Sequence, residues 1–246
     1  MADDIEDVLK LDLDGSIARI TIDRPNRGNM LTLDMLDHVS ALIIDAGCDP
    51  EIKAISISST GDDFCLGRDP QSAPEHTPKN GVEMREALTA PILGFYEAVR
   101  GAEVPVVATV QGRAAGFGCA AAAVCDVTIA ADDARFSLPE MKHDLPPTAA
   151  ISAHIDRSMP KSVAWLVYST EEVDAQTARA AGFVSHVVPA GNLYSAADEV
   201  LATLASRDRT ALMTCKTYIA NARLMETPQA SDYAANMLAL VMASKG

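Results

Sequence analysis

The stretch from residue 104 to residue 131 constrains the fold more than any other part of the chain. Residues 104–110 form a continuous apolar run, which is typical of a strand buried on both faces. A glycine-rich turn follows at 112–118, and after it come a short alanine-rich run at 119–124 and a second strand-like segment at 126–131. A strand, a turn, a buried helix and a further strand in this order indicate an α/β fold.

The residues before this stretch add strands and helices of their own. Asp14 and Gly15 predict the tight turn of a hairpin between two short strands. Thr32 is placed to cap a helix that ends at Gly47. The segment 71–81 contains three prolines and no periodicity, so we expect a long loop there. The expected elements are strands at 8–12, 16–23 and 52–59 and helices at 32–47 and 82–100.

Beyond Asp144 the sequence becomes mainly helical. Apolar stripes near the C-terminus, which include Leu238 and Val241, are broader than the face of one monomer needs. They suggest an oligomer contact, although packing on the core of the same chain explains them nearly as well. The expected elements are helices at 161–168, 175–181, 193–207, 210–225 and 228–244 and a strand at 184–188.

The charge balance excludes several classes of partner. The chain has 34 acidic and 20 basic residues and a formal net charge of −14, with the basic residues scattered along it. Neither a nucleic acid nor an anionic membrane surface is expected to bind such a chain. The chain has no apolar run of membrane-spanning length, its N-terminus is acidic, and its five cysteines form no C-x-x-C pair. We therefore expect a cytoplasmic protein with reduced thiols and no metal site.

Two glycine-containing turns follow apolar strands and are candidates for ligand binding. The first contains Leu66, Gly67 and Arg68, and the second contains Gly116 and Phe117 just before the predicted buried helix. Glycine lets the backbone approach a ligand, and the amides at a helix start point outward as donors. Two such amides converging on one point form an oxyanion hole, although each motif taken alone is more often a simple tight turn. The glycine spacing does not fit the dinucleotide-binding pattern.

Taken together, these motifs resemble the enoyl-CoA hydratase/isomerase (crotonase) family. The segments "FCLGRD", "VPVVATVQGRAAGFGCAAAAVCDVTIAADDARFSLPEM" and "AQTARAAGFVSHVVP" occur in the family's order and with similar separations. The resemblance implies a spiral of ββα units with an acyl-CoA site at 1–190 and a helical oligomerisation region at 191–246. It also implies a homotrimer or homohexamer, and no separate cofactor, because coenzyme A is part of the substrate.

The resemblance implies roles for particular residues. The backbone amides of Arg68 and Phe117 would hold the thioester oxygen, and Glu140 matches the second of two glutamates that the family's hydratases use. The first glutamate is replaced by Ala120. Because syn-addition of water needs one group to orient the nucleophile and another to deliver the proton, a single carboxylate serves hydration poorly.

One glutamate is enough to move a proton between two carbons of the same acyl chain. We therefore expect a 3-enoyl to 2-enoyl-CoA isomerase, with an enoyl-CoA hydratase or a non-catalytic acyl-CoA-binding protein as the alternatives. Arg24 matches a family arginine near the CoA phosphates, and Arg27 adds charge beside it. The resemblance also places Leu66, Gly67 and Gly116 against the substrate. The roles of His143 and Asp144 stay open, and Asp69 is expected to cap a helix after the first turn.

Overall fold

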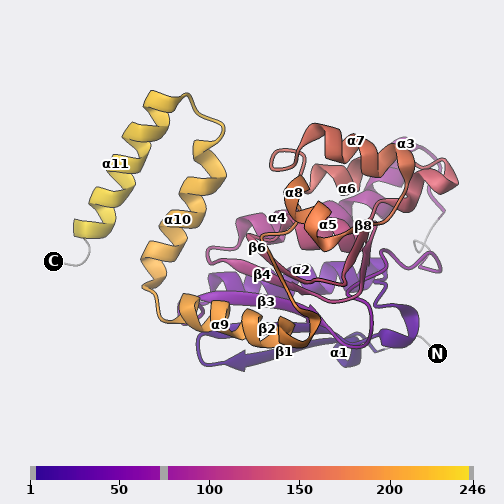
Figure 1. Ribbon diagram of the computed structural model, residues 1–246, viewed down its shortest axis with the longest axis horizontal. Coiled ribbons are helices and arrows are strands. Elements are labelled where there is room, and N and C mark those ends of the chain that lie inside the picture. Colours follow the sequence, from indigo (N-terminus) through magenta and orange to yellow (C-terminus); the bar gives the residue numbers. More distant parts are fainter. Residues whose placement is uncertain (1–3, 73–76, 244–246) are drawn as a thin grey trace.

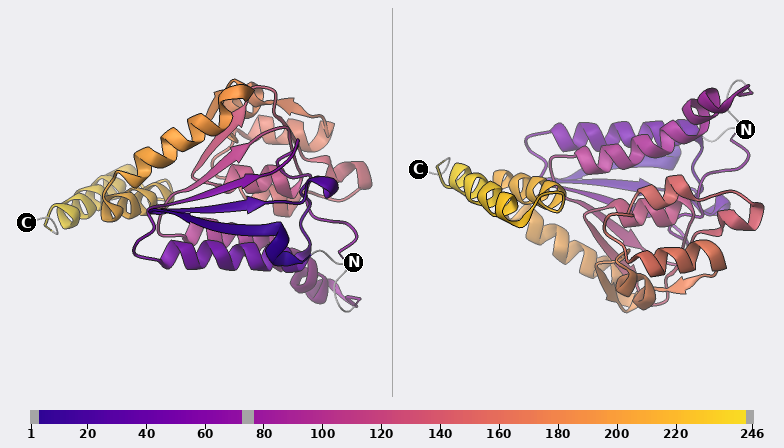
Figure 2. Two further views of the ribbon diagram at one scale, coloured as in Figure 1. Left: turned by 90° about the horizontal axis from the view of Figure 1, so that it is seen from below. Right: turned by 90° about the horizontal axis from the view of Figure 1, so that it is seen from above.

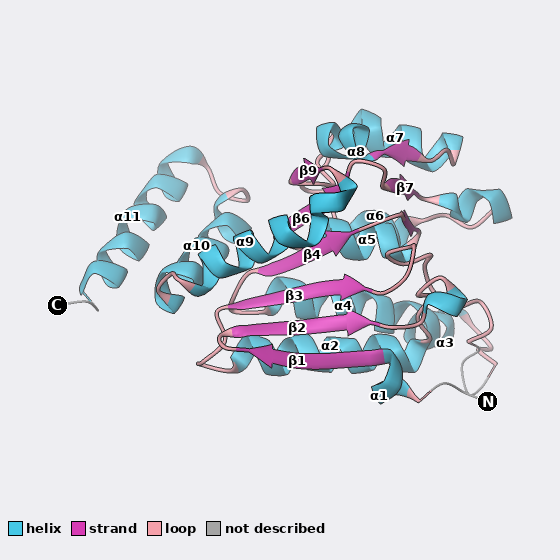
Figure 3. Ribbon diagram, turned by 60° about the horizontal axis from the view of Figure 1, so that its bottom comes forward, coloured by secondary structure: helices cyan, strands magenta, loops and turns pink. Residues whose placement is uncertain are grey.

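A computed structural model describes residues 4–72 and 77–243. Its larger sheet has the strand order β1, β2, β3, β4, β6 and β9 (Figure 3). The first pair is antiparallel and every other neighbouring pair is parallel. The predicted α/β class is therefore confirmed. The strands are β1 (Leu9–Asp14), β2 (Ile17–Ile22), β3 (Ala54–Ser59), β4 (Val106–Val110), β6 (Val127–Ala131) and β9 (His186–Val188).

The hairpin at the start of the chain forms as predicted. The β1–β2 register runs from the pair Leu9 and Ile22 to the pair Asp14 and Ile17. Gly15 in the turn has a φ of +59°, a left-handed conformation that glycine adopts without steric cost. This hairpin occupies the edge of the sheet, while β4, which is buried at all five positions, lies in its interior.

Helices cover both faces of the larger sheet. Helices α2 (Leu33–Cys48) and α4 (Ala90–Gly101) lie on one face and α9 (Leu193–Ala205) on the other (Figure 2). The side chain of Thr32 accepts a hydrogen bond from the Met35 amide at 3.2 Å, which confirms the predicted N-cap of α2. The apolar stripe of α2 and the buried face of the sheet form the main core.

A smaller sheet lies beside the larger one and positions the candidate site. It has the order β5 (Arg113–Ala115), β7 (Arg135–Ser137) and β8 (Val173–Asp174). Helix α5 (Phe117–Val124) follows β5 after one residue, and all eight of its residues are buried. The predicted sequence of strand, glycine turn, buried helix and strand is confirmed, with β5 as an additional short strand inside the turn.

The helix predicted at 82–100 is interrupted. The structure has α3 (Gly81–Met84), a π-helical segment η2 (Arg85–Thr89) and then α4. Pro91 is at the start of α4 and has no amide hydrogen to donate to the preceding turn. The π-helical turn directly before Pro91 accommodates this missing bond within a continuous helical segment.

The C-terminal helices α10 (Arg209–Ala222) and α11 (Thr227–Ala243) form a hairpin that projects from the body of the molecule (Figure 1). Lys216 joins α10 to the body, since its Nζ lies 2.8 Å from the Val99 carbonyl oxygen and 2.8 Å from Asp126 Oδ2. Whether residue 190 divides two domains stays a prediction. No helix within the described ranges is long and apolar enough to cross a bilayer.

Most of the remaining helices lie close to their predicted positions. Of the predicted loop at 71–81, residues 73–76 lie outside the described residues, as does residue 244 of the last predicted helix. The remaining elements are α1 (Ile5–Val8), η1 (Pro25–Arg27), η3 (Pro139–His143), α6 (Thr148–Ser152), α7 (Pro160–Ser169), α8 (Ala175–Ala181) and η4 (Ala190–Asn192).

Candidate active site

The two glycine turns identified in the sequence lie side by side. The Ala115 amide donates to the Cys65 carbonyl oxygen at 2.9 Å, and the Cys65 amide donates to the Arg113 carbonyl oxygen at 3.2 Å. A Cβ at Gly118 would overlap the Cys65 carbonyl oxygen. Only glycine therefore permits the two backbones to approach this closely. Segments about fifty residues apart in the chain thus form one backbone surface.

The amides of Arg68 and Phe117 are available as hydrogen-bond donors. Within residues 4–72 and 77–243 neither amide has a hydrogen-bond acceptor. Phe117 is the first residue of α5, and the preceding Gly116 has the dihedrals φ +53° and ψ −118°. Amides at a helix start point away from the helix with the positive end of its dipole behind them. Both residues line the same cavity, so the structure brings together the two predicted oxyanion donors.

Glu140 lies against the second turn. It is in η3, directly after β7, and β7 pairs with β5, which leads into that turn. A Cβ added to Gly116 would lie 2.9 Å from Glu140 Oε1, so the carboxylate occupies the space beside the glycine. Glu140 Oε2 is buried and has no hydrogen-bond partner among the described residues. Burial raises the pKa of Glu140 above its ordinary value, which suits a group that must both take up and release a proton.

A cavity of about 480 Å³ joins these groups. Of the predicted site residues, Leu66, Gly67, Arg68, Gly116, Phe117 and Glu140 line it. The rest of its lining is largely apolar. It comes from α4 and the π-helical turn before it, from Met30 and Pro70 in two loops, and from the segment that runs from η3 to residue 150. A mostly apolar cavity with a few convergent polar groups is typical of a site for a small organic ligand.

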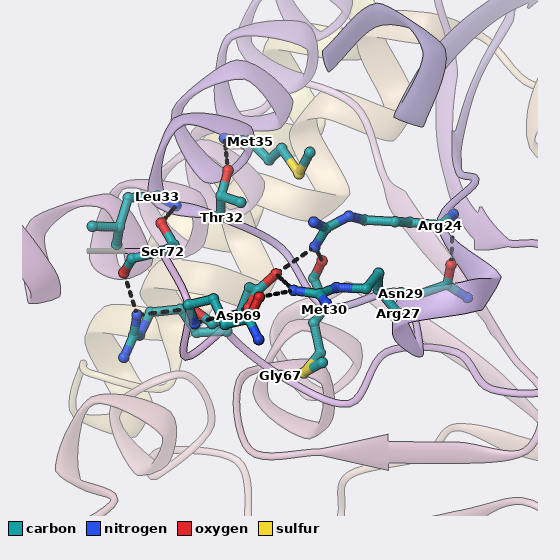
Figure 4. Close-up of polar contacts among 12 residues, drawn as sticks. Arg24, Arg27, Asn29, Met30, Thr32, Leu33, Met35, Gly67, Asp69 and Ser72 are labelled. Carbon is teal, nitrogen blue, oxygen red and sulfur yellow. Dashed lines mark hydrogen bonds and ion pairs between the residues drawn. The ribbon is translucent and has the colours of Figure 1, made fainter. Parts of the chain in front are cut away.

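Arg24 and Arg27 lie beside the first turn and do not line the cavity as far as the structure describes it. Both guanidinium groups donate to the carboxylate of Asp69, Arg24 at 2.8 Å and Arg27 at 3.1 Å (Figure 4). The second Asp69 oxygen accepts the Gln71 amide at 2.9 Å. Asp69 therefore links two loops. The prediction that it caps a helix is wrong, because residues 70–72 after it form a turn and not a helix.

Next to this Asp69 cluster (Asp69, Arg24 and Arg27), a backbone bridge to Leu31 fixes the chain around Arg68. The Leu31 amide donates to the Gly67 carbonyl oxygen at 3.1 Å, and the Asp69 amide donates to the Leu31 carbonyl oxygen at 2.8 Å. Arg68 is therefore held from both sides. Burial pushes the pKa of Asp69 upward, but its hydrogen bonds from Arg24, the Gln71 amide and Arg27 lower the pKa below the usual value.

The cavity presents one carboxylate among its described lining residues, Glu140. Ala120 is completely buried in α5 and is not among those residues. His143 is exposed and lines the cavity, whereas Asp144 ends η3 in a left-handed conformation with a φ of +55°. No group of three or more histidine, cysteine, aspartate or glutamate side chains within the described ranges is arranged to hold a metal ion.

Sequence reasoning missed Tyr96. It is completely buried on α4 and lines the cavity, and its hydroxyl has no hydrogen-bond partner in the described parts of the chain. Its ring stacks on the ring of Phe117 with centroids 6.1 Å apart and planes at 12°. The helical periodicity of 82–100 predicts that one face is buried, but no local signal indicates which of its side chains lie against a ligand cavity.

The fold and the paired turns define a crotonase-fold protein. The crystal structure of human enoyl-CoA hydratase domain-containing protein 3 superimposes with a TM-score of 0.88 at 25% identity, covering 96% of this chain and 92% of that one. The crystal structure of an enoyl-CoA hydratase from Mycobacterium smegmatis gives a TM-score of 0.89 at 24% identity, covering 96% and 91%. The second similarity concerns the fold alone.

Sequence comparisons agree with the fold. Residues 12–245 match the model of the enoyl-CoA hydratase/isomerase family. The probable enoyl-CoA hydratase echA8 of Mycobacterium bovis is 30% identical over 211 residues, which cover 85% of this chain and 80% of that protein. The short-chain-enoyl-CoA hydratase of Clostridium acetobutylicum is 31% identical over 197 residues, covering 77% and 72%. The chain belongs to the enoyl-CoA hydratase/isomerase family.

Proposed function

We propose that this protein isomerises 3-enoyl-CoA thioesters to 2-enoyl-CoA thioesters, with Glu140 as the single proton carrier. The observation that supports the proposal is that Glu140 is the one carboxylate among the described residues lining the cavity, beside two backbone amides that have no acceptor in those residues. Ala120, at the position of the first hydratase glutamate, supplies no second acid or base. The proposal includes the acyl-CoA substrate and the assignment of the amides to its thioester oxygen.

The reaction needs only these groups. The Glu140 carboxylate removes a proton from C2, and the electron pair of the broken C–H bond moves toward the thioester, so that negative charge develops on its oxygen. The amides of Arg68 and Phe117 donate hydrogen bonds to that oxygen, and the loss of one such donor typically costs about 10²–10³ in rate. The protonated Glu140 then delivers the proton to C4, and the double bond shifts from C3 to C2.

We also propose that Arg24 and Arg27 bind the phosphates of the CoA moiety. Two guanidinium groups lie together on the carboxylate of Asp69 beside the first turn, in a protein whose formal net charge is −14. Guanidinium groups match phosphate oxygens in geometry. Exposed apolar residues on the projecting α10–α11 hairpin, among them Ile219 and Leu240, support the further proposal of a homotrimer or homohexamer.

The central experiment measures exchange of C2 protons in deuterated water over a panel of acyl-CoA thioesters, because exchange reports the enolate whatever the product. Glu140→Gln is expected to lower exchange and isomerisation by at least about 100-fold while acyl-CoA still binds. Glu171→Gln, which changes an exposed glutamate away from the cavity, is the control. Because the Glu140 pKa is raised, the acid limb of the rate profile is expected above pH 4.5. Undiminished exchange in Glu140→Gln would remove this residue from the mechanism.

Hydration is the second candidate function, and the names of the relatives in Mycobacterium bovis and Clostridium acetobutylicum favour it. Starting from 2-enoyl-CoA, the two reactions give different products, because only a hydratase forms 3-hydroxyacyl-CoA. Mass spectrometry of the thioester pool separates them. Hydration faster than double-bond migration would refute the argument from a single glutamate. Binding of acyl-CoA without any proton exchange would instead indicate a non-catalytic protein.

A further inference from the structure

Tyr96 places a polar group in the wall of a cavity whose lining is mostly apolar. The residue is 0% exposed and lines the cavity from α4. Its hydroxyl is buried, and no protein group in residues 4–72 or 77–243 accepts or donates a hydrogen bond there. Phenylalanine would fill the same space without leaving a buried hydroxyl unpaired, so the hydroxyl group requires an explanation.

The position of this hydroxyl is fixed by packing. The Tyr96 ring stacks on the ring of Phe117, and Phe95 packs edge-on against both rings, with centroids 6.2 Å from Tyr96 and 5.2 Å from Phe117. The Phe117 amide is one of the two proposed oxyanion donors. Three interlocked rings therefore hold the Tyr96 side chain in a constant relation to the reacting end of a bound thioester.

The hydroxyl is suited to donate a hydrogen bond. Burial raises the pKa of Tyr96 strongly, and the negative charge of Glu140 raises this pKa further. The phenol therefore keeps its proton at any pH at which the protein works, and it is not a base. The groups that the proposed reaction uses are already assigned, since the thioester oxygen accepts from two amides and the C2 proton goes to Glu140. The phenol is left to meet another part of the acyl group.

We propose that Tyr96 is a specificity-determining residue that donates a hydrogen bond to an oxygen carried by the acyl chain. The preferred substrates are then oxygen-substituted acyl-CoA thioesters, with a hydroxyl or carbonyl group along the chain, and not plain hydrocarbon chains. A hydrocarbon chain leaves the hydroxyl unpaired in the filled cavity, whereas an oxygen acceptor pairs it. A site that contains such a donor discriminates strongly against analogues without the acceptor. This inference rests on the proposed acyl-CoA function.

The test compares pairs of thioesters that differ by one oxygen. Saturated acyl-CoA thioesters with a hydroxyl at C3, C4 or C5 are titrated by calorimetry beside their unsubstituted parents. Glu140→Gln protein is used throughout, so that the ligands stay chemically unchanged. With Tyr96 present, at least one hydroxylated member is expected to bind about 10- to 100-fold more tightly than its parent. Adding Tyr96→Phe is expected to reduce that ratio to about one, while affinity for the parent stays equal or rises.

Tyr194→Phe is the matched control, because Tyr194 is half exposed and lies outside the cavity lining. It is expected to leave the ratio unchanged. A structural role for the Tyr96 hydroxyl would lower the melting temperature in Tyr96→Phe, whereas our proposal predicts an equal or higher one. The proposal is overturned if no hydroxylated thioester binds better than its parent, or if Tyr96→Phe keeps the preference. Binding with that preference but without proton exchange in otherwise unmodified protein would refute the proposed isomerisation and leave the Tyr96 assignment standing.

Discussion

Replacing Asp69 with asparagine tests whether the cluster beside the first turn holds the proposed oxyanion donor in place. Asparagine keeps the size of the side chain but removes its charge. The Asp69 side chain is only 2% exposed, and that of its partner Arg24 only 10%, so this pair is almost completely buried. Breaking a buried pair from one side typically costs about 3–5 kcal/mol. The second partner, Arg27, is 38% exposed and adds at most about 1 kcal/mol.

We therefore expect Asp69→Asn to lower the free energy of unfolding by about 3 kcal/mol in urea titrations, because the amide oxygen still accepts one hydrogen bond. Exchange of C2 protons is expected to fall by at least about 10-fold. Arg68 lies between two backbone bonds to Leu31, and the Asp69 carboxylate is linked through Arg24 to the neighbouring Met30 carbonyl oxygen, so loss of that link lets this backbone shift. The Asp69 pKa is lowered in the folded protein, so its stabilisation is present above pH 4 and disappears as the pH falls through that lowered pKa.

The control is Asp198→Asn, since Asp198 is 59% exposed and pairs with Arg19 at the surface. That change is expected to alter the free energy of unfolding by less than about 1 kcal/mol. The reasoning is refuted if Asp69→Asn unfolds at the same urea concentration as Asp198→Asn. Lost stability with an unchanged exchange rate would show that the cluster supports the loop but does not position the Arg68 amide.

Two more predictions concern groups near and away from the cavity. Gly116→Ala is expected to destabilise the fold by about 1–3 kcal/mol, because φ is +53° and the new Cβ meets Glu140 Oε1. Urea titration and proton exchange check it, and an unchanged exchange rate would mean that the carboxylate does not need its present place. Burial lowers the pKa of His154 to about 4, so stability is expected to fall by up to about 3 kcal/mol as the pH drops from 6.5 toward 4. Melting temperatures of the unmodified protein and His154→Gln test this, and an equal pH slope in both would contradict it.

The elements that the sequence predicts well are those whose ends are set by residues close by in the chain. Helix α8 occupies the predicted range because the Asp174 side chain accepts the Thr177 amide at its start and Gly182 adopts a left-handed conformation at its end. Both signals lie within two residues of the helix itself, where capping rules apply. The two glycine turns were recognisable for the same reason, because each follows an apolar strand directly. Interpreting the two turns as an oxyanion hole required the family resemblance, because each turn alone also fits an ordinary connection between a strand and a helix.

The features that sequence did not predict depend on distant contacts. Asp69 pairs with Arg24, 45 residues earlier, and nothing near either residue indicates the pairing. Tyr96 is one of several apolar or aromatic positions in a predicted helix, and only the tertiary packing shows that it lines the cavity. Pro91 lies within the helix predicted at 82–100, and a proline there can end or distort a helix. In the structure the chain before it stays helical on the surface, so the effect of Pro91 is a widened turn and not the end of the helix.

Under the proposed function, the net charge of −14 and the Asp69 cluster together limit how coenzyme A can bind. The overall field opposes an anion, so the attraction must come from charges fixed near the cavity. Arg24 and Arg27 are already held on Asp69, so little side-chain entropy remains to be lost when a phosphate arrives. Asp69 also directly follows Arg68, whose backbone amide is one of the two proposed oxyanion donors, in the sequence. Under the proposed function, one buried aspartate therefore orders both the groups that bind the nucleotide and one of the groups that stabilises the enolate.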